Sequence, residues 1–116
     1  MSRDPAYLLD ILNSAHLVLE FVQGVDRVDF DRDTMRQYAV VHSIMIIGEA
    51  ARRISQEFRG EHPELPWQNM IGMRSRIIHN YDEIDLDIVW RVVESEIPKL
   101  ISLVEPLVPP DEEPDH

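Results

Sequence analysis

The chain has 116 residues, 44% of them hydrophobic, with no cysteine and a formal net charge of −11. This length predicts a single domain, and the absence of cysteine excludes disulfides, thiol nucleophiles and thiolate metal sites. The net negative charge argues against a protein that binds nucleic acid along its length, as a chromatin protein does. Because no apolar run of about 20 residues and no signal-peptide core is present, we expect a cytoplasmic protein with no membrane partner.

The first predicted helix covers residues 5–23. Asp4 is a favourable N-cap, Pro5 fits the first helical position, and Gly24 is a typical stop. Apolar residues recur between these signals at helical spacing, which predicts one buried face.

The second predicted helix covers residues 32–58, with Asp31 as its N-cap. Its apolar residues alternate steps of four and three, at Val40, Ile44, Ile47, Ala51, Ile54 and Phe58. Because neighbouring positions are apolar too, we expect this helix to contact both its own core and a second subunit. Gly48 in its middle costs about 1 kcal/mol relative to alanine, which indicates that another helix approaches closely there.

A connector rich in proline and acidic residues follows, and a third predicted helix covers residues 66–78. Asp85 is a suitable N-cap for the last predicted helix, whose apolar pattern reaches Val104. Pro98 lies inside that pattern, so we expect a kink or a break near residues 94–97.

These segments predict an all-α fold, an up-and-down helical bundle of four to five helices, because the sequence shows no strand alternation and no glycine-rich phosphate loop. We expect the helical domain to cover residues 1–105. Residues 106–116 combine prolines with acidic residues, which is typical of a disordered tail.

Three side chains suited to phosphodiester chemistry lie within eight residues: Arg74, His79 and Tyr81. Arginine offers a planar fork to phosphate oxygens, and histidine is the side chain that ordinarily titrates near neutral pH. Together they could hold a phosphodiester and move its protons without a metal, which predicts RNA cleavage. The charge distribution permits an RNA substrate, because residues 50–79 carry five arginines against three glutamates. The alternative for any one of these arginines is a solvated charge on a helix face.

The wider pattern of the chain resembles the HepT-like branch of the HEPN superfamily from about residue 5 to about residue 105. The matching residues are Ile47, Gly48, Glu49, Ala50, Pro66, Trp67, Gly72, Met73, Arg74, His79, Tyr81, Trp90 and Pro98. The resemblance implies a small all-helical, HEPN-like ribonuclease toxin that forms a homodimer and is paired with a nucleotidyltransferase antitoxin. It also implies that Arg74-x4-His79 is the catalytic motif. One departure is Ser75, which stands where this family often has asparagine.

The spacing of the motif raises a geometric question. On a continuous helix five positions rotate the chain by about 500°, so His79 would lie about 140° around from Arg74. Either the helix ends between them, with Asn80 in a left-handed conformation, or the arginine of one chain meets the histidine of another. We favour a symmetric homodimer with two copies of each residue in one groove, partly because the resemblance implies a dimer.

The expected reaction is attack of the ribose 2′-hydroxyl on the adjacent phosphorus, with His79 as general acid or base and Arg74 stabilising the phosphorane. It requires no metal and no cofactor. Ser75 and Arg76 are expected to support or position the RNA, although Arg76 could instead be a surface charge. Tyr81 is expected to contact RNA or, as the resemblance implies, to receive AMP from the antitoxin; its alternative role is to cover the core.

A second function stays open at this point. The same cleft could belong to a non-catalytic helical module that binds a nucleotide or a partner protein.

Overall fold

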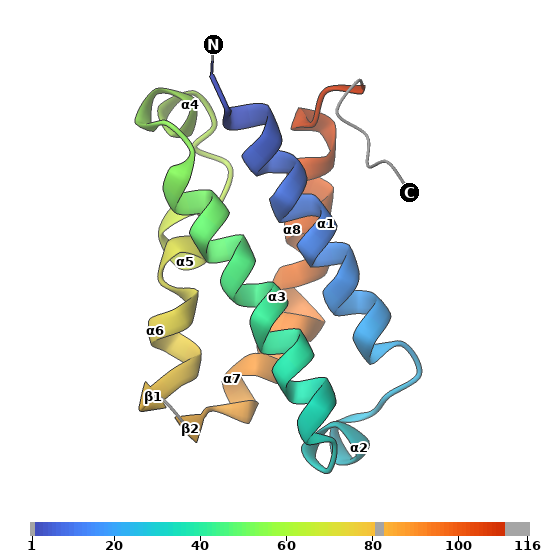
Figure 1. Cartoon of the computed structure of the whole chain (residues 1–116). Helices are drawn as coiled ribbons and strands as arrows, with labels where there is room; N and C mark the ends of the chain where they lie inside the picture. Colours follow the sequence, from blue (N-terminus) through green and yellow to red (C-terminus); the bar gives the residue numbers. More distant parts are fainter. Residues whose placement is uncertain (1, 81–82, 111–116) are drawn as a thin grey trace.

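Four helical columns run alternately up and down in the computed structural model, which describes residues 2–80 and 83–110 (Figure 1). Two columns are the continuous helices α1 (Asp4–Val22) and α3 (Thr34–Arg53). The third consists of α5 (Trp67–Ile71) and α6 (Met73–Ile77), and the fourth of α7 (Leu86–Arg91), the π-helical turn η1 (Val92–Glu96) and α8 (Ile97–Val104). Connecting elements are the helices α2 (Arg27–Asp31) and α4 (Gln56–Glu61), the strands β1 (Ile78–Asn80) and β2 (Glu83–Ile84), and the 3-10 turn η2 (Glu105–Leu107). The predicted fold class, an all-α up-and-down bundle, is confirmed.

The core lies between the four columns, and each column contributes a fully buried isoleucine: Ile11, Ile44, Ile77 and Ile97. Burying one such side chain stabilises the fold by about 1.5–3 kcal/mol relative to leaving it exposed. The most extensive packing is between α1 and α3, which lie side by side along their lengths (Figure 1). Among the described residues, no helix is both long enough and apolar enough to cross a membrane.

Both predicted ends of the second helix, residues 32–58, are wrong, because α3 covers Thr34–Arg53. Asp33 rather than Asp31 is the N-cap of α3, because its carboxylate accepts a hydrogen bond from the Arg36 backbone N–H at 3.0 Å. At the other end Ile54 is extended, with φ −68° and ψ 139°, and ends the helix. The Ser55 hydroxyl then accepts from the Phe58 backbone N–H at 3.1 Å and begins α4.

Asp4 has a different role from the predicted N-cap. It lies within α1, is buried, and accepts hydrogen bonds from Ser55, one from the backbone N–H at 2.9 Å and one from the hydroxyl at 2.7 Å. Burial raises the pKa of Asp4, but the hydrogen bonds from Ser55 outweigh that effect and leave its pKa below the ordinary value. The start of α1 is thereby tied to the junction of α3 and α4.

The third column is interrupted where the sequence predicted one helix over residues 66–78. A turn at Gly72 separates α5 from α6, and α6 ends at Ile77. The close approach predicted at Gly48 is confirmed, since a Cβ built there would lie 2.9 Å from the carbonyl oxygen of Met70. Helix α3 can therefore sit tightly against α5 only because position 48 lacks a side chain.

The last column begins as predicted, with Asp85 as the N-cap of α7. The irregularity expected near Pro98 is the π-helical turn η1, which ends directly before α8. Proline removes a backbone donor and collides with the carbonyl four residues earlier, and a wider turn relieves that collision. Beyond α8, Leu107 and Val108 still pack against the core, so the packed chain extends past the predicted boundary at residue 105. Residues 111–116 of the expected tail lie outside the described residues.

Candidate active site

The chain between Arg74 and His79 changes from helix to strand. Helix α6 ends at Ile77, and β1 then pairs antiparallel with β2, with Ile78 opposite Ile84. The helix therefore ends between the two motif residues, which was one of the two predicted solutions. The predicted left-handed Asn80 is wrong: Asn80 belongs to β1, and no described residue other than glycine has a positive φ. Strand pairing, which the sequence pattern did not indicate, is what stops the helix.

His79 projects from β1 and is held by a carboxylate. Its Nε2 lies 3.0 Å from Oδ2 of Asp85, and 51% of the His79 side chain remains exposed. The hydrogen bond from His79 and a second from the Ile88 backbone N–H hold the pKa of Asp85 below its ordinary value. The imidazole is thus anchored at one nitrogen while much of the ring faces solvent.

Asp85, which the sequence analysis recognised only as a helix cap, contacts the candidate site residue His79. No sequence pattern indicated this second contact, because it depends on the short hairpin: the two-strand ladder between residues 78 and 84 brings residue 85 back beside residue 79. The Asp85 backbone N–H also donates to the Ile77 carbonyl at 2.7 Å. Both the backbone and the side chain of Asp85 therefore contact the segment that follows α6.

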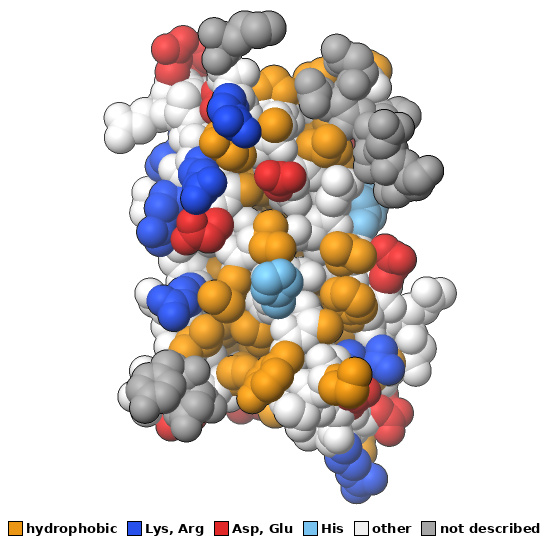
Figure 2. Space-filling view, viewed as in Figure 1, with side chains coloured by type: hydrophobic (Ala, Val, Ile, Leu, Met, Phe, Trp, Pro, Cys, Tyr) orange, Lys and Arg blue, Asp and Glu red, His pale blue; other side chains and the backbone are white. Residues whose placement is uncertain are grey.

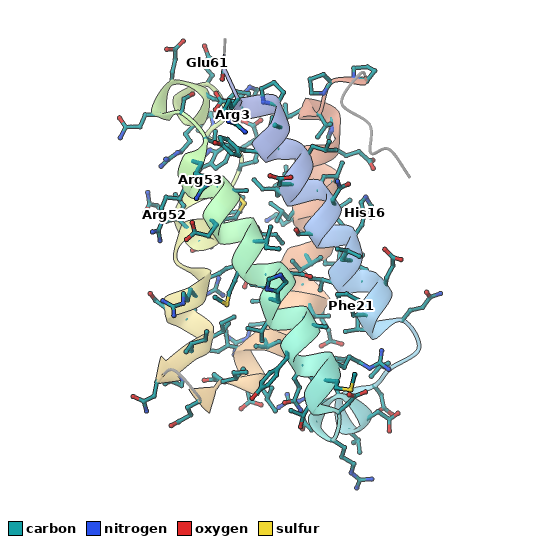
Figure 3. The ribbon with its side chains drawn as sticks, viewed as in Figure 1. Arg3, His16, Phe21, Arg52, Arg53 and Glu61 are labelled. Carbon is teal, nitrogen blue, oxygen red and sulfur yellow. The ribbon has the colours of Figure 1, made fainter. Side chains whose placement is uncertain are left out.

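Arg74 is exposed on α6 and faces α3. It lines a small pocket whose other lining residues are Met45, Gly48, Glu49, Arg52 and Ile71. Figure 2 shows Lys and Arg side chains gathered along the edge where α3 adjoins α5 and α6, and Figure 3 identifies Arg52 and Arg53 among them. An anion approaching Arg74 would therefore meet a second guanidinium, Arg52, with the carboxylate of Glu49 beside it.

The other predicted supporting residues divide into three cases. Ser75 is exposed on α6. Arg76 is half-buried and forms a two-pronged ion pair with Glu96 of η1, at 3.0 Å and 2.6 Å. This hydrogen-bonded pair raises the pKa of Arg76 and ties α6 to the last column, so Arg76 is not a free surface charge. Its role in positioning RNA stays a prediction. Tyr81 lies outside the described residues.

Within one chain the two motif residues contact different neighbours. Arg74 faces the pocket against α3, whereas His79 is bonded to Asp85 at the start of α7. Among the described residues, no group of three or more His, Cys, Asp or Glu side chains is arranged to hold a metal ion. The chemical groups near the motif are the guanidinium groups of Arg74 and Arg52 in the pocket against α3, and the imidazole–carboxylate pair of His79 and Asp85.

Fold and site together define a small all-α protein that exposes an Arg-x4-His motif at one end of a helical bundle. The sequence profile of the Ribonuclease HepT-like family matches residues 11–107. The chain belongs to this family, and the predicted HEPN-like fold and enzyme class, a ribonuclease, are confirmed.

Individual relatives agree with this assignment. The protein named Putative RNase MJ1380 from Methanocaldococcus jannaschii is 42% identical over 100 residues, covering 86% of this chain and 92% of its own length. Probable ribonuclease HepT from Thermococcus cleftensis is 39% identical over 94 residues, covering 81% and 86%. Putative RNase TTE0752 from Caldanaerobacter subterraneus is 38% identical over 94 residues, covering 81% and 84%. No solved structure gave a significant match.

Proposed function

We propose that this chain is a metal-independent endoribonuclease toxin that acts as a homodimer in the cytoplasm and is controlled by a nucleotidyltransferase antitoxin. The observation that carries the proposal is the exposure of Arg74 and His79 on the consecutive elements α6 and β1, in a chain of the HepT-like family. The half-exposed imidazole can reach a substrate proton, and the guanidinium beside Arg52 can reach a phosphate.

The proposed reaction is a transesterification. A base removes the proton of the ribose 2′-hydroxyl, the 2′-oxygen bonds to the adjacent phosphorus, and the bond from phosphorus to the 5′-oxygen breaks. An acid protonates that leaving oxygen, so the products carry a 2′,3′-cyclic phosphate and a 5′-hydroxyl. His79 supplies the base or the acid, and two copies in a dimer supply both. DNA lacks the 2′-hydroxyl and is not a substrate.

Arg74 has a separate role in this reaction. The phosphorane carries more negative charge than the starting diester, and a guanidinium already in place stabilises that extra charge. General acid–base catalysis supplies roughly 10²–10⁴ in rate, and a preorganised charge donor roughly another 10²–10³. These two contributions are enough for a slow but toxic nuclease. Arg52 lies in the same pocket and would help to bind the phosphate.

The distribution of the site residues supports the proposed homodimer. Arg74 and His79 face different neighbours in one chain, and a two-fold axis near α6 and β1 would bring each arginine to the histidine of the partner. Helix α3 also carries exposed apolar side chains, with Met35 84% and Tyr38 59% exposed. Figure 2 shows further hydrophobic side chains along the face that α1 and α3 form, which a second copy could cover.

Regulation by the antitoxin is proposed at Tyr81. Transfer of AMP from ATP to its hydroxyl, with release of pyrophosphate, would place a bulky anion two residues from His79 in the sequence. The attached AMP would then block binding of the substrate phosphate. Co-expression with a cognate nucleotidyltransferase should add the mass of AMP to the peptide that contains Tyr81. Addition of the same mass to a Tyr81→Phe protein would exclude this position.

The test of the nuclease is incubation of the purified protein with total RNA in EDTA. We expect wild type to cleave the RNA, and Arg74→Ala and His79→Ala to lose at least about 100-fold in rate. Matched controls are Arg32→Ala and His16→Ala, which remove an exposed arginine beside α2 and an exposed histidine on α1 (Figure 3 labels His16). Unchanged cleavage by both site variants would remove the residue assignment. No cleavage by wild type would favour a non-catalytic binding module.

A further inference from the structure

The His79–Asp85 contact is unusual among the aspartate N-caps of the described residues. Asp26, Asp33 and Asp85 each accept a hydrogen bond from the backbone N–H three residues later. The second oxygen of Asp33 binds Arg36 within its own helix, at 3.0 Å. The second oxygen of Asp85 reaches out of its helix to the ring of His79 in β1. Capping alone does not require that second contact.

Asp85 is held rigidly in this position. Its Oδ1 accepts from the Ile88 backbone N–H at 3.1 Å, and its own backbone N–H donates to the Ile77 carbonyl at 2.7 Å. Its side chain is only 27% exposed, compared with 51% for His79. Rotation of the carboxylate away from His79 would therefore also break the cap of α7. A fixed acceptor of this kind orients the ring that donates to it.

We propose that Asp85 is the positioning residue of His79: it takes the hydrogen bond of Nε2, so that the imidazole presents Nδ1 to the RNA. This inference rests on the proposed function. An ionised carboxylate can only accept hydrogen bonds, so the proton of the neutral ring lies on Nε2 and the lone pair on Nδ1. Nδ1 is then the atom that takes the 2′-hydroxyl proton, and in the cation its N–H is the one that protonates the leaving oxygen.

The carboxylate also stabilises the imidazolium that forms when Nδ1 takes a proton. The lowered pKa of Asp85 keeps it ionised throughout the neutral range, which is consistent with this role. Other charged groups come from the elements packed against β1. Glu83 on β2 accepts from the Asn80 amide at 3.3 Å, while α6 contributes Arg74 and the paired Arg76. Of these groups, Asp85 is the one whose hydrogen bond to the His79 ring is present in the structure.

The test compares Asp85→Asn and Asp85→Ser with wild type. Both replacements are good N-caps, so α7 should be retained and the thermal midpoint should stay close to that of wild type. We expect kcat to fall roughly 10- to 100-fold with little change in KM. This loss is part of the roughly 10²–10⁴-fold rate enhancement that general acid–base catalysis supplies. Asp26→Asn, the same exchange at a cap remote from the site, should change neither kcat nor KM.

A second readout does not depend on activity. Nitrogen-15 NMR of the intact protein reports which ring nitrogen carries the proton, and wild-type His79 should be protonated at Nε2 at neutral pH. A neutral His79 protonated at Nδ1 would overturn the inference, as would a kcat in Asp85→Asn that matches wild type. These failures differ from failure of the proposed function, which would appear as full cleavage by His79→Ala although wild-type His79 is protonated at Nε2.

Discussion

The two halves of the bundle are built differently. Helices α1 and α3 are continuous over 19 and 20 residues, whereas the columns that follow consist of segments of 5 to 8 residues. Arg74 and His79 both belong to the segmented half. Each interruption there has a specific cause: a turn at Gly72, strand pairing after Ile77, and the π-helical turn before Pro98. The continuous helices provide the surface against which the other half packs. The breaks in that other half orient the side chains proposed for RNA cleavage.

The largest expected effect comes from disturbing the contact between the two halves. In Gly48→Ala the new Cβ would meet the Met70 carbonyl oxygen at 2.9 Å, and backbone at that distance cannot move aside cheaply. We expect a loss of about 2 kcal/mol in the free energy of unfolding, since overpacking outweighs the helix preference of alanine. Urea denaturation of the variant and wild type measures this difference in the free energy of unfolding. Gly60→Ala is the matched control, because nothing lies within 4 Å of its added Cβ and stability should be unchanged or higher.

The next effect concerns the link between α6 and η1. Arg76→Ala leaves Glu96 half-buried without its partner, and we expect a loss of about 1–2 kcal/mol, less than for a fully buried pair because about a third of each side chain reaches solvent. Arg27→Ala removes a more exposed partner of Asp87 and should cost less than about 1 kcal/mol. Equal losses in the two variants would show that the Arg76–Glu96 pair has no special role in the segmented half.

The smallest effect concerns the end of the continuous half, where Asp4 holds Ser55. The pKa of Asp4 is lower in the folded than in the unfolded chain. Ionised Asp4 therefore adds its full contribution to the free energy of unfolding above the unfolded pKa of about 3.9, and this contribution is lost as the pH falls through the folded pKa. We expect wild type to exceed Asp4→Asn by about 1 kcal/mol at pH 6, and this difference to shrink below about pH 4. Asp10→Asn, at an exposed position of the same helix, should differ little from wild type at any pH. A difference for Asp4→Asn that does not depend on pH would contradict the assigned role.

The same division explains what the sequence could predict. In the continuous half, periodic apolar residues such as Ile44 and Ile47 indicated the helix and its buried face, and Gly48 indicated a close neighbour. The ends were less certain because several aspartates compete as caps, and Asp33 rather than Asp31 is the one whose carboxylate meets the first turn. Local patterns favour a cap but do not decide among neighbours.

In the segmented half, contacts distant in sequence decide the structure. The spacing allowed a helix end between Arg74 and His79 as one of two solutions, but gave no indication of the ladder that follows the helix. The Arg76–Glu96 and His79–Asp85 contacts depend on where η1 and β2 lie in space. Periodicity carries no information about such pairs, because it reports one element at a time.

The central claim is that Arg74 of one protomer and His79 of its partner act on the same phosphodiester. The direct measurement mixes purified Arg74→Ala and His79→Ala proteins, allows subunits to exchange, and follows RNA cleavage in EDTA. Each variant alone should lose at least about 100-fold in rate. The mixture should recover part of the wild-type rate, because a mixed dimer contains one site with both Arg74 and His79, although it lacks the second histidine that would supply the other proton transfer. A mixture that contains mixed dimers and still fails to cleave would contradict the claim.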